Sequence, residues 1–105
     1  MQPNPTMPAA EARLTTTLAA SRYLGQLCRH FEHKLPATYD EGFHHGRIEF
    51  PFGVCTLAAE SPDTLVMTAT AATAEDLERL ERVIGSHLER FAFRETFTID
   101  WQSRA

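Results

Sequence analysis

The chain has 105 residues, 43% of them hydrophobic and 23% charged, and a net charge of −4. A chain of this length forms one domain around a single core. The negative charge argues against a general nucleic-acid binder, which needs a dominant positive field. No apolar run reaches the roughly 20 residues that span a bilayer. We therefore expect a cytoplasmic protein with no nucleic-acid or membrane partner.

The N-terminal stretch 1–10 contains three prolines and no apolar segment of signal-peptide length. It predicts a flexible tail, followed by a single domain over 11–105. Cys28 and Cys55 are too few for a disulfide scaffold, and neither belongs to a CxxC pair. We expect both to be buried thiols in a reducing compartment.

The first half of the domain predicts one strand and one helix. Apolar and polar residues alternate over 12–18, which favours a half-buried strand. A helix then begins near Ser21, a plausible N-cap, and ends before Pro36, which cannot donate the backbone hydrogen bond. The segment 38–45 is rich in turn formers and acids and predicts a loop. The apolar face of the helix comprises Leu24, Leu27, Cys28, Phe31 and Leu35.

The second half predicts a meander, a helix and a last strand. Strands over 47–50 and 54–58 form a hairpin whose bend uses the permissive backbone of Gly53, and a third strand covers 64–70. A capping box at Thr73 starts the second helix. A final strand is predicted over 96–101 from alternating residues. The second helix buries Leu77, Leu80, Ile84, Leu88 and Phe91.

The predicted order of elements is β-α-β-β-β-α-β, an α+β fold. One mainly antiparallel sheet of about five strands, with two helices packed on one face, would bury both apolar helix faces. The pattern leaves the strand order in the sheet open.

His30 and His33 are three residues apart on the first helix, so their side chains are neighbours. They could supply two imidazole ligands to zinc, iron or haem. Cys28 faces the core and cannot join them in a one-helix chelate. The alternative is a pair of surface histidines with no ligand.

His87 falls on the margin of the apolar face of the second helix. It is either a hydrogen-bonded core histidine or a ligand-facing one, lining a cavity between the helices and the loop around His45.

Arg47 could clamp a carboxylate or phosphate, or could pair with Glu49 on the same strand face. Tyr23, Arg94 and Trp101 could also contact a ligand, although such residues commonly only pack. No nucleophile elbow and no glycine-rich phosphate loop is present.

Three segments, Arg22–Pro36, Gly46–Gly53 and Ser86–Glu95, give the chain its resemblance to a bacterial family, the domain-of-unknown-function family 2218. Members of that family are small stand-alone proteins, and the same type of domain is also joined to flavin reductases that interact with siderophores. The resemblance implies a role near iron acquisition: binding a small iron chelate or haem, or docking to such a reductase. It implies no catalytic residues and specifies no cofactor.

The sequence thus favours a non-catalytic module that binds a ligand or partner linked to iron and siderophore metabolism. One alternative is a homodimerising or docking module that pairs through exposed strand edges, such as the first or last strand. A second alternative is a small enzyme with His87 as general base. The residues expected to contact a ligand are His30, His33, His45, Arg47, His87 and Arg94.

Overall fold

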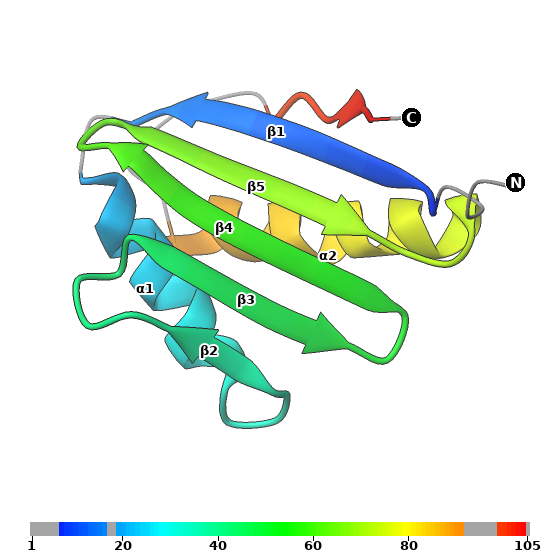
Figure 1. Ribbon diagram of the computed structural model, residues 1–105, viewed down its shortest axis with the longest axis horizontal. Helices are drawn as coiled ribbons and strands as arrows, with labels where there is room; N and C mark the ends of the chain where they lie inside the picture. Colours follow the sequence, from blue (N-terminus) through cyan, green and yellow to red (C-terminus); the bar gives the residue numbers. More distant parts are fainter. Residues whose placement is uncertain (1–6, 17–18, 92–98, 105) are drawn as a thin grey trace, which may run out of the picture.

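The computed structural model describes residues 7–16, 19–91 and 99–104. It has two helices and one antiparallel sheet, so the predicted α+β class is confirmed (Figure 1). The elements in chain order are β1 (Ala9–Thr15), α1 (Ala20–Phe31), β2 (Ala37–Tyr39), β3 (His45–Phe50), β4 (Gly53–Ser61), β5 (Thr64–Thr70), α2 (Ala74–Phe91) and β6 (Gln102–Ser103).

The six strands follow the spatial order β2-β3-β4-β5-β1-β6, and each neighbouring pair is antiparallel. Both described helices lie on one face of the sheet, as predicted, and neither of them covers the other face (Figure 1). The first strand is not an edge strand, contrary to our expectation, because β1 lies between β5 and β6. The edges are β2 and β6, three and two residues long, and such short edges discourage pairing with another chain.

The core lies between the sheet and the two helices. From α1, Leu24, Leu27 and Cys28 are completely buried, and Leu80 and Ile84 are buried equally from α2. Each such aliphatic side chain contributes roughly 1.5–3 kcal/mol through its removal from water. Cys28 and Cys55 are both free and buried, which confirms that they are buried thiols.

The first helix differs from the prediction at both ends. Its N-cap is Ala19, with no side-chain cap, so the prediction that Ser21 caps the helix is wrong. The helix ends at Phe31, and the Leu35 N–H still donates to the Phe31 carbonyl at 2.8 Å before Pro36 stops the turn. The second helix does begin with the predicted cap, since the Asp76 N–H donates to Thr73 Oγ1 at 3.1 Å.

The strand β2 overlaps the start of the stretch 38–45 that we predicted to be a loop. It pairs with β3 through Ala37, Thr38 and Tyr39. The Tyr39 hydroxyl donates to Glu32 Oε1 at 2.9 Å, which fastens this edge strand to the end of α1. The hydrogen bond to Glu32 at the end of α1, and not an alternation of apolar residues along the strand, therefore holds β2 in place.

The first and last strands are displaced from their predicted positions. β1 begins at Ala9, which lies within the stretch expected to be a tail, and ends at Thr15, while the predicted positions 17 and 18 lie outside the described residues. The last strand is Gln102–Ser103 rather than 99–101, while the predicted positions 96–98 lie outside the described residues. Ile99 and Trp101 instead lie half-buried against the core. Their alternation with polar residues reflects alternating burial. A segment can be buried in this way without pairing with a strand of the sheet.

Gly53 serves a different purpose from the one that the sequence suggested. No described glycine has a positive φ, and the β3–β4 turn is formed by Pro51 and Phe52. A Cβ at Gly53 would lie only 2.6 Å from the Thr70 carbonyl oxygen and 3.0 Å from Leu80 Cδ2. The glycine is needed because β4, β5 and α2 approach one another closely there.

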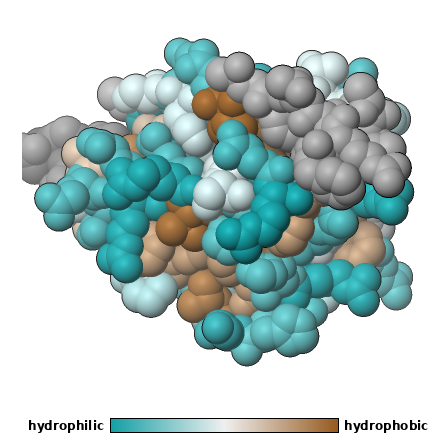
Figure 2. All heavy atoms as spheres, turned by 180° about the vertical axis from the view of Figure 1, so that it is seen from behind, coloured by the Kyte–Doolittle hydropathy of each residue, from teal (hydrophilic) through white to brown (hydrophobic). Residues whose placement is uncertain are grey.

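Figure 2 shows the side of the molecule that carries the helices. Hydrophobic atoms are visible there only as separate small patches among hydrophilic side chains. Within the described residues, no helix is long and apolar enough to cross a membrane.

Candidate functional site

His30 of α1 and His87 of α2 lie side by side where the two helices meet. Their ring centroids are 5.0 Å apart, and the ring planes are inclined by 49°. The residues are 57 positions apart in the sequence, and only the packing of the two helices brings them together. The structure thus joins two of the six residues expected to contact a ligand.

Aromatic rings surround this histidine pair. Phe31 packs against both imidazoles, with centroid distances of 4.9 Å to His30 and 4.8 Å to His87. Phe91 contacts His30 edge-on at 5.5 Å, and Phe50 extends the cluster by packing 5.1 Å from Phe31. His30 is exposed and His87 half-buried, so the pair has an apolar backing and an open side. We predicted Phe31 and Phe91 as core residues only, and their contact with the histidines was not foreseen.

The hydrogen bond of His87 fixes its tautomer. Its Nδ1 lies 2.7 Å from the Val83 carbonyl oxygen. Because a carbonyl oxygen only accepts, Nδ1 carries the proton and donates it to this bond. In the neutral ring, Nε2 then has a free lone pair directed away from the backbone of α2. The hydrogen bond satisfies Nδ1, as expected for a core histidine, and leaves Nε2 for a ligand.

The surroundings of His30 disfavour protonation of its imidazole. Its partial burial lowers its pKa below 6.5, and the neighbouring His87 and Arg90 lower it further. His33 and Lys34 act in the same direction. These effects favour the neutral imidazole of His30, and the positive groups near it would attract an anion more than a cation.

His45 and Arg47 lie on the opposite face of the sheet from the helices. Gly46, between them, faces α1, since a Cβ there would lie 2.6 Å from Cys28 Sγ. Side chains alternate along a strand, so His45 and Arg47 face away from α1. Arg47 Nε lies 3.8 Å from Glu49 Oε2, which confirms the predicted pairing on that strand.

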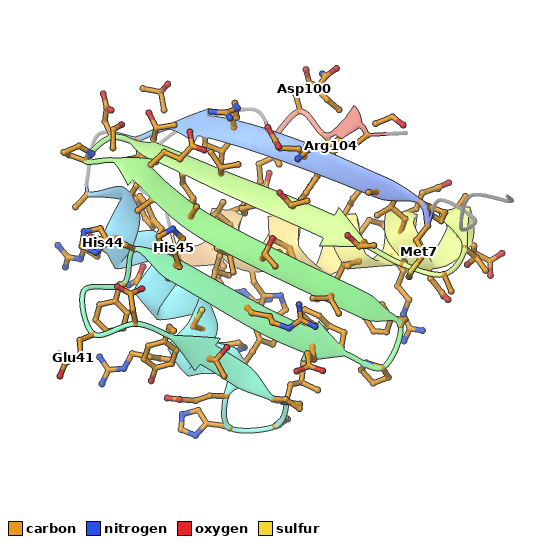
Figure 3. The ribbon with its side chains drawn as sticks, in the orientation of Figure 1. Met7, Glu41, His44, His45, Asp100 and Arg104 are labelled. Atoms are coloured by element: carbon orange, nitrogen blue, oxygen red, sulfur yellow. The ribbon has the colours of Figure 1, made fainter. Side chains whose placement is uncertain are left out.

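The start of β3 is held by Asp40. Its Oδ1 accepts the His45 N–H at 2.6 Å and the His44 N–H at 2.9 Å. Figure 3 shows His44 and His45 at the loop end of β3. The hydrogen bond from His45 is the largest cause of the lowered pKa of this carboxyl. His33 is exposed near the end of α1, and Arg94 lies outside the described residues. The five expected contacts that the structure describes therefore do not share one site, since His45 and Arg47 lie on the opposite face of the sheet from His30 and His87.

Among the described residues, no three histidine, cysteine, aspartate or glutamate side chains are grouped so that they could hold a metal ion. Cys28 points into the core, where burial raises its pKa to about 11, so its thiolate is not available as a third ligand. The histidine pair offers at most two nitrogens to a metal.

Fold and site together define a small α+β domain with a pair of imidazoles between its helices. A model of the family described as "Uncharacterized protein conserved in bacteria (DUF2218)" matches residues 11–102, and the chain belongs to this family. The resemblance read from the sequence is thereby confirmed.

A solved structure is similar over nearly the whole chain. It is the NMR structure of PA4090 from Pseudomonas aeruginosa, with 30% sequence identity and a TM-score of 0.73. The similarity covers 92% of this chain and 96% of that one. Among curated proteins, none matches the chain significantly.

Proposed function

We propose that this chain is a non-catalytic binding domain whose ligand docks on the His30–His87 pair. The observation that carries the proposal is the 5.0 Å separation of two imidazoles from different helices. Two imidazoles bound to one metal ion at about 2.1 Å have ring centres roughly 5 Å apart. The separation of the two rings is therefore compatible with a shared metal.

The ligand that fits best is a small anionic chelate of iron. Two imidazoles alone leave a metal ion short of ligands, and a chelate supplies the remainder. Imidazole is a suitable ligand for iron. The positive charges of Arg90 and Lys34, which act on His30, favour an anion, and Phe31 and Phe91 offer apolar contact. The resemblance to domains joined to siderophore-interacting flavin reductases supports iron as the metal and such a reductase as a partner.

Calorimetric and optical titration with ferric nitrilotriacetate tests this proposal. We expect binding at micromolar concentrations, and no binding of nitrilotriacetate without iron. His30→Gln and His87→Phe should each weaken binding by roughly tenfold or more, about 1.4 kcal/mol. His87→Phe keeps an aromatic ring in the cluster and removes both ring nitrogens, together with the hydrogen bond to the Val83 carbonyl.

The matched control is His45→Ala, which removes a histidine from the opposite face of the sheet. We expect it to leave binding of the ferric chelate unchanged. Thermal unfolding of each variant shows whether the fold is retained. Absence of binding, or equal weakening by His45→Ala, would overturn the proposal.

Self-association through the open face of the sheet is a second candidate. Register places Arg47, Thr56, Thr68 and Glu11 in one row across β3, β4, β5 and β1. A two-fold axis parallel to the strands would set Arg47 against the partner's Glu11 and the threonines against each other, which supports a face-to-face homodimer. Light scattering tests it: a dimer that Arg47→Glu dissociates is expected, and a monomer at millimolar concentration excludes it.

A further inference from the structure

A hollow of about 340 Å³ lies on the exposed side of α1, next to the loop between β2 and β3. Arg22, Gln26 and Arg29 line it from the helix, and Phe43 lines it from the loop. The two arginines are seven residues apart, so they lie on one side of α1, roughly 10 Å apart along its axis. None of the lining residues belongs to the histidine cluster.

A strained turn holds the ring of Phe43 in this hollow. Phe43 has a φ of 57°, and no other non-glycine residue in the described ranges has a positive φ. A bulky residue rarely adopts this left-handed conformation. The Phe43 N–H donates to the Asp40 carbonyl oxygen at 3.0 Å, and the ring stacks on Tyr39 at 5.3 Å. The turn thus directs Phe43 back onto α1.

The helix accommodates this ring with a glycine. A Cβ at Gly25 would lie 3.0 Å from Phe43 Cδ1 and 3.1 Å from Phe43 Cγ, which is closer than ordinary contact. A glycine inside a helix weakens the helix relative to alanine. Phe43 nevertheless remains only half-buried. Strain in the loop and a glycine in the helix therefore place an accessible apolar ring between two arginines.

The arginines of this hollow have no anionic partner. In the part of the chain that the structure describes, the side chain of neither Arg22 nor Arg29 forms an ion pair or a hydrogen bond. Glu32, the acid nearest to Arg29 in the sequence, instead accepts a hydroxyl from β2. Arg13 on the sheet, by contrast, pairs with a glutamate of β4 at 2.7 Å. The guanidinium groups on α1 are therefore available to an external anion.

The charge around this hollow has one sign. None of the residues that line it is acidic. Residues 20–34 carry three cationic side chains, Arg22, Arg29 and Lys34, against Glu32 alone, in a chain whose net charge is −4. Positive charge is thus concentrated on α1, and the remainder of the chain is acidic.

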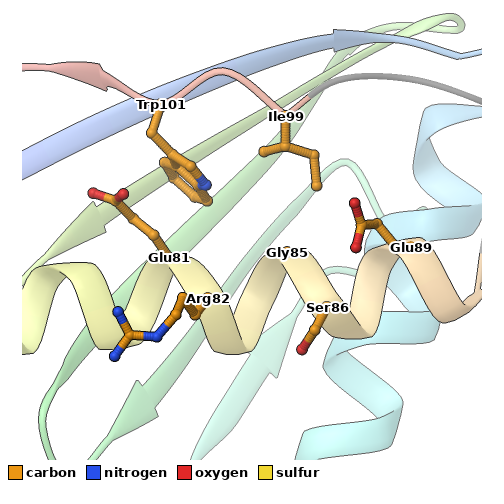
Figure 4. Close-up of a pocket in the computed structure, with 7 residues that line it drawn as sticks. All are labelled: Glu81, Arg82, Gly85, Ser86, Glu89, Ile99 and Trp101. Carbon is orange, nitrogen blue, oxygen red and sulfur yellow. The ribbon is translucent and has the colours of Figure 1, made fainter.

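A larger hollow, of about 560 Å³, provides the contrast. It lies between α2 and the segment that carries Ile99 and Trp101 (Figure 4). Glu81 and Glu89 border it together with Arg82, so both signs of charge are present. That hollow favours neither a cation nor an anion, whereas the hollow on α1 favours an anion.

We propose that the hollow on α1 docks an acidic peptide segment of a partner protein. An apolar side chain of the segment contacts the accessible part of Phe43, and carboxylates on either side of it pair with Arg22 and Arg29. The planar fork of a guanidinium suits a carboxylate. An extended peptide advances about 3.3 Å per residue, so carboxylates two to four residues apart span the distance between the arginines. A polynucleotide fits less well, because its phosphates would also meet the negative charge of the remaining chain.

An NMR titration of the full chain with the peptide acetyl-Glu-Glu-Leu-Glu-Glu-amide tests the proposal. We expect saturable shifts of the Gly25, Gln26 and Phe43 amides at submillimolar concentrations, and weaker binding at higher salt. The peptide with glutamine in place of every glutamate should not bind. The peptide with glycine in place of leucine should bind severalfold more weakly, because it lacks the apolar contact.

Variants of α1 identify the groups that bind. Arg22→Gln and Arg29→Gln should each weaken binding by roughly threefold to tenfold. Gln26→Glu places a carboxylate within helical reach of both arginines, so it should abolish peptide binding while the unfolding temperature is kept or raised. The matched control is Arg13→Gln, which changes the net charge by the same amount on the sheet and should leave binding unchanged.

The absence of saturable shifts up to roughly 5 mM peptide would overturn the proposal. Equal weakening by Arg13→Gln would also overturn it, because it would show attraction to net charge alone. A thymidine octanucleotide that binds as tightly as the peptide would show a general polyanion site and would refute the assignment to a protein partner. His87→Phe should leave peptide binding intact, so this surface is tested independently of the histidine pair.

Discussion

Alternate residues of β3 enter two different environments. Ile48 and Phe50 are buried beneath the helices, whereas Arg47 and Glu49 are exposed on the face that neither described helix covers. The covered face is filled so closely that glycine is required at Gly46 and Gly53. Polar side chains that a ligand could reach therefore lie on the outer surfaces of the helices and on the uncovered face of the sheet. The packed core between helices and sheet fixes the positions of both surfaces.

The largest expected effect comes from neighbouring positions on β3. Ile48→Ala removes a completely buried side chain and should lower the free energy of unfolding by about 2–5 kcal/mol. Arg47→Ala, one residue earlier, removes only an exposed side chain with a long 3.8 Å ion pair, and its effect should stay within about 0.5 kcal/mol. Urea unfolding measures both. Equal losses would contradict the assignment of these residues to opposite faces.

A smaller effect is expected from two glycines whose added Cβ atoms would meet a neighbour at the same distance. At Gly46 the neighbour is Cys28 Sγ in the core, at 2.6 Å, and at Gly42 it is the exposed His44 ring, also at 2.6 Å. Gly46→Ala should cost about 1–3 kcal/mol through overpacking. Gly42→Ala should change stability by less than about 0.5 kcal/mol, because the imidazole can turn away. Chemical denaturation of the two variants compares the covered side with the surface directly.

The elements that the sequence predicted well are those with long apolar periodicity. α1, α2 and the meander of β3, β4 and β5 all follow from repeated burial of one face. β2 escaped prediction because three residues carry too little periodicity, and the bond from Tyr39 to Glu32 that holds it joins different elements. β1 was placed three residues late because its first residues are alanines, whose small side chains give a weak signal.

The candidate sites were less predictable than the fold, because they arise between elements. No pattern in either helix indicates that His30 and His87 meet, and their proximity depends on how α1 and α2 pack on the sheet. The groove between α2 and the segment of Ile99 and Trp101 does have a local signal, since Glu81, Gly85 and Glu89 repeat every four residues along α2. Only the fold shows that Trp101 lies above that stripe. The sequence thus shows the spacing of residues along one helix, but it does not show which segment packs against that helix.

The buried thiol of Cys28 predicts a loss of stability at alkaline pH. Burial raises its pKa from 9.0 to about 11 in the folded chain. Above pH 9 the unfolded chain releases this proton while the folded chain retains it, so stability falls as the pH rises from 9 toward 11. At pH 10 the raised pKa of Cys28 lowers the free energy of unfolding by about 1 kcal/mol. Unfolding measured from pH 8 to 10 should show a shallower decline in Cys28→Ala than in the unchanged chain. Parallel declines would contradict a buried, protonated thiol.

The smallest effect concerns the protonation of His30. Its lowered pKa means that the unfolded chain binds this proton more readily, so stability should fall slightly as the pH drops below 6.5. NMR titration should place the pKa of His30 below 6.5. His87→Phe should raise it, because the ring packing is kept and the charge is removed, and Arg90→Gln should raise it less. Arg47→Gln, on the uncovered face, should leave it unchanged. A pKa that rises equally in all three variants would mean that His30 senses only the net charge of the domain, and the electrostatic coupling of the histidine pair would then be refuted.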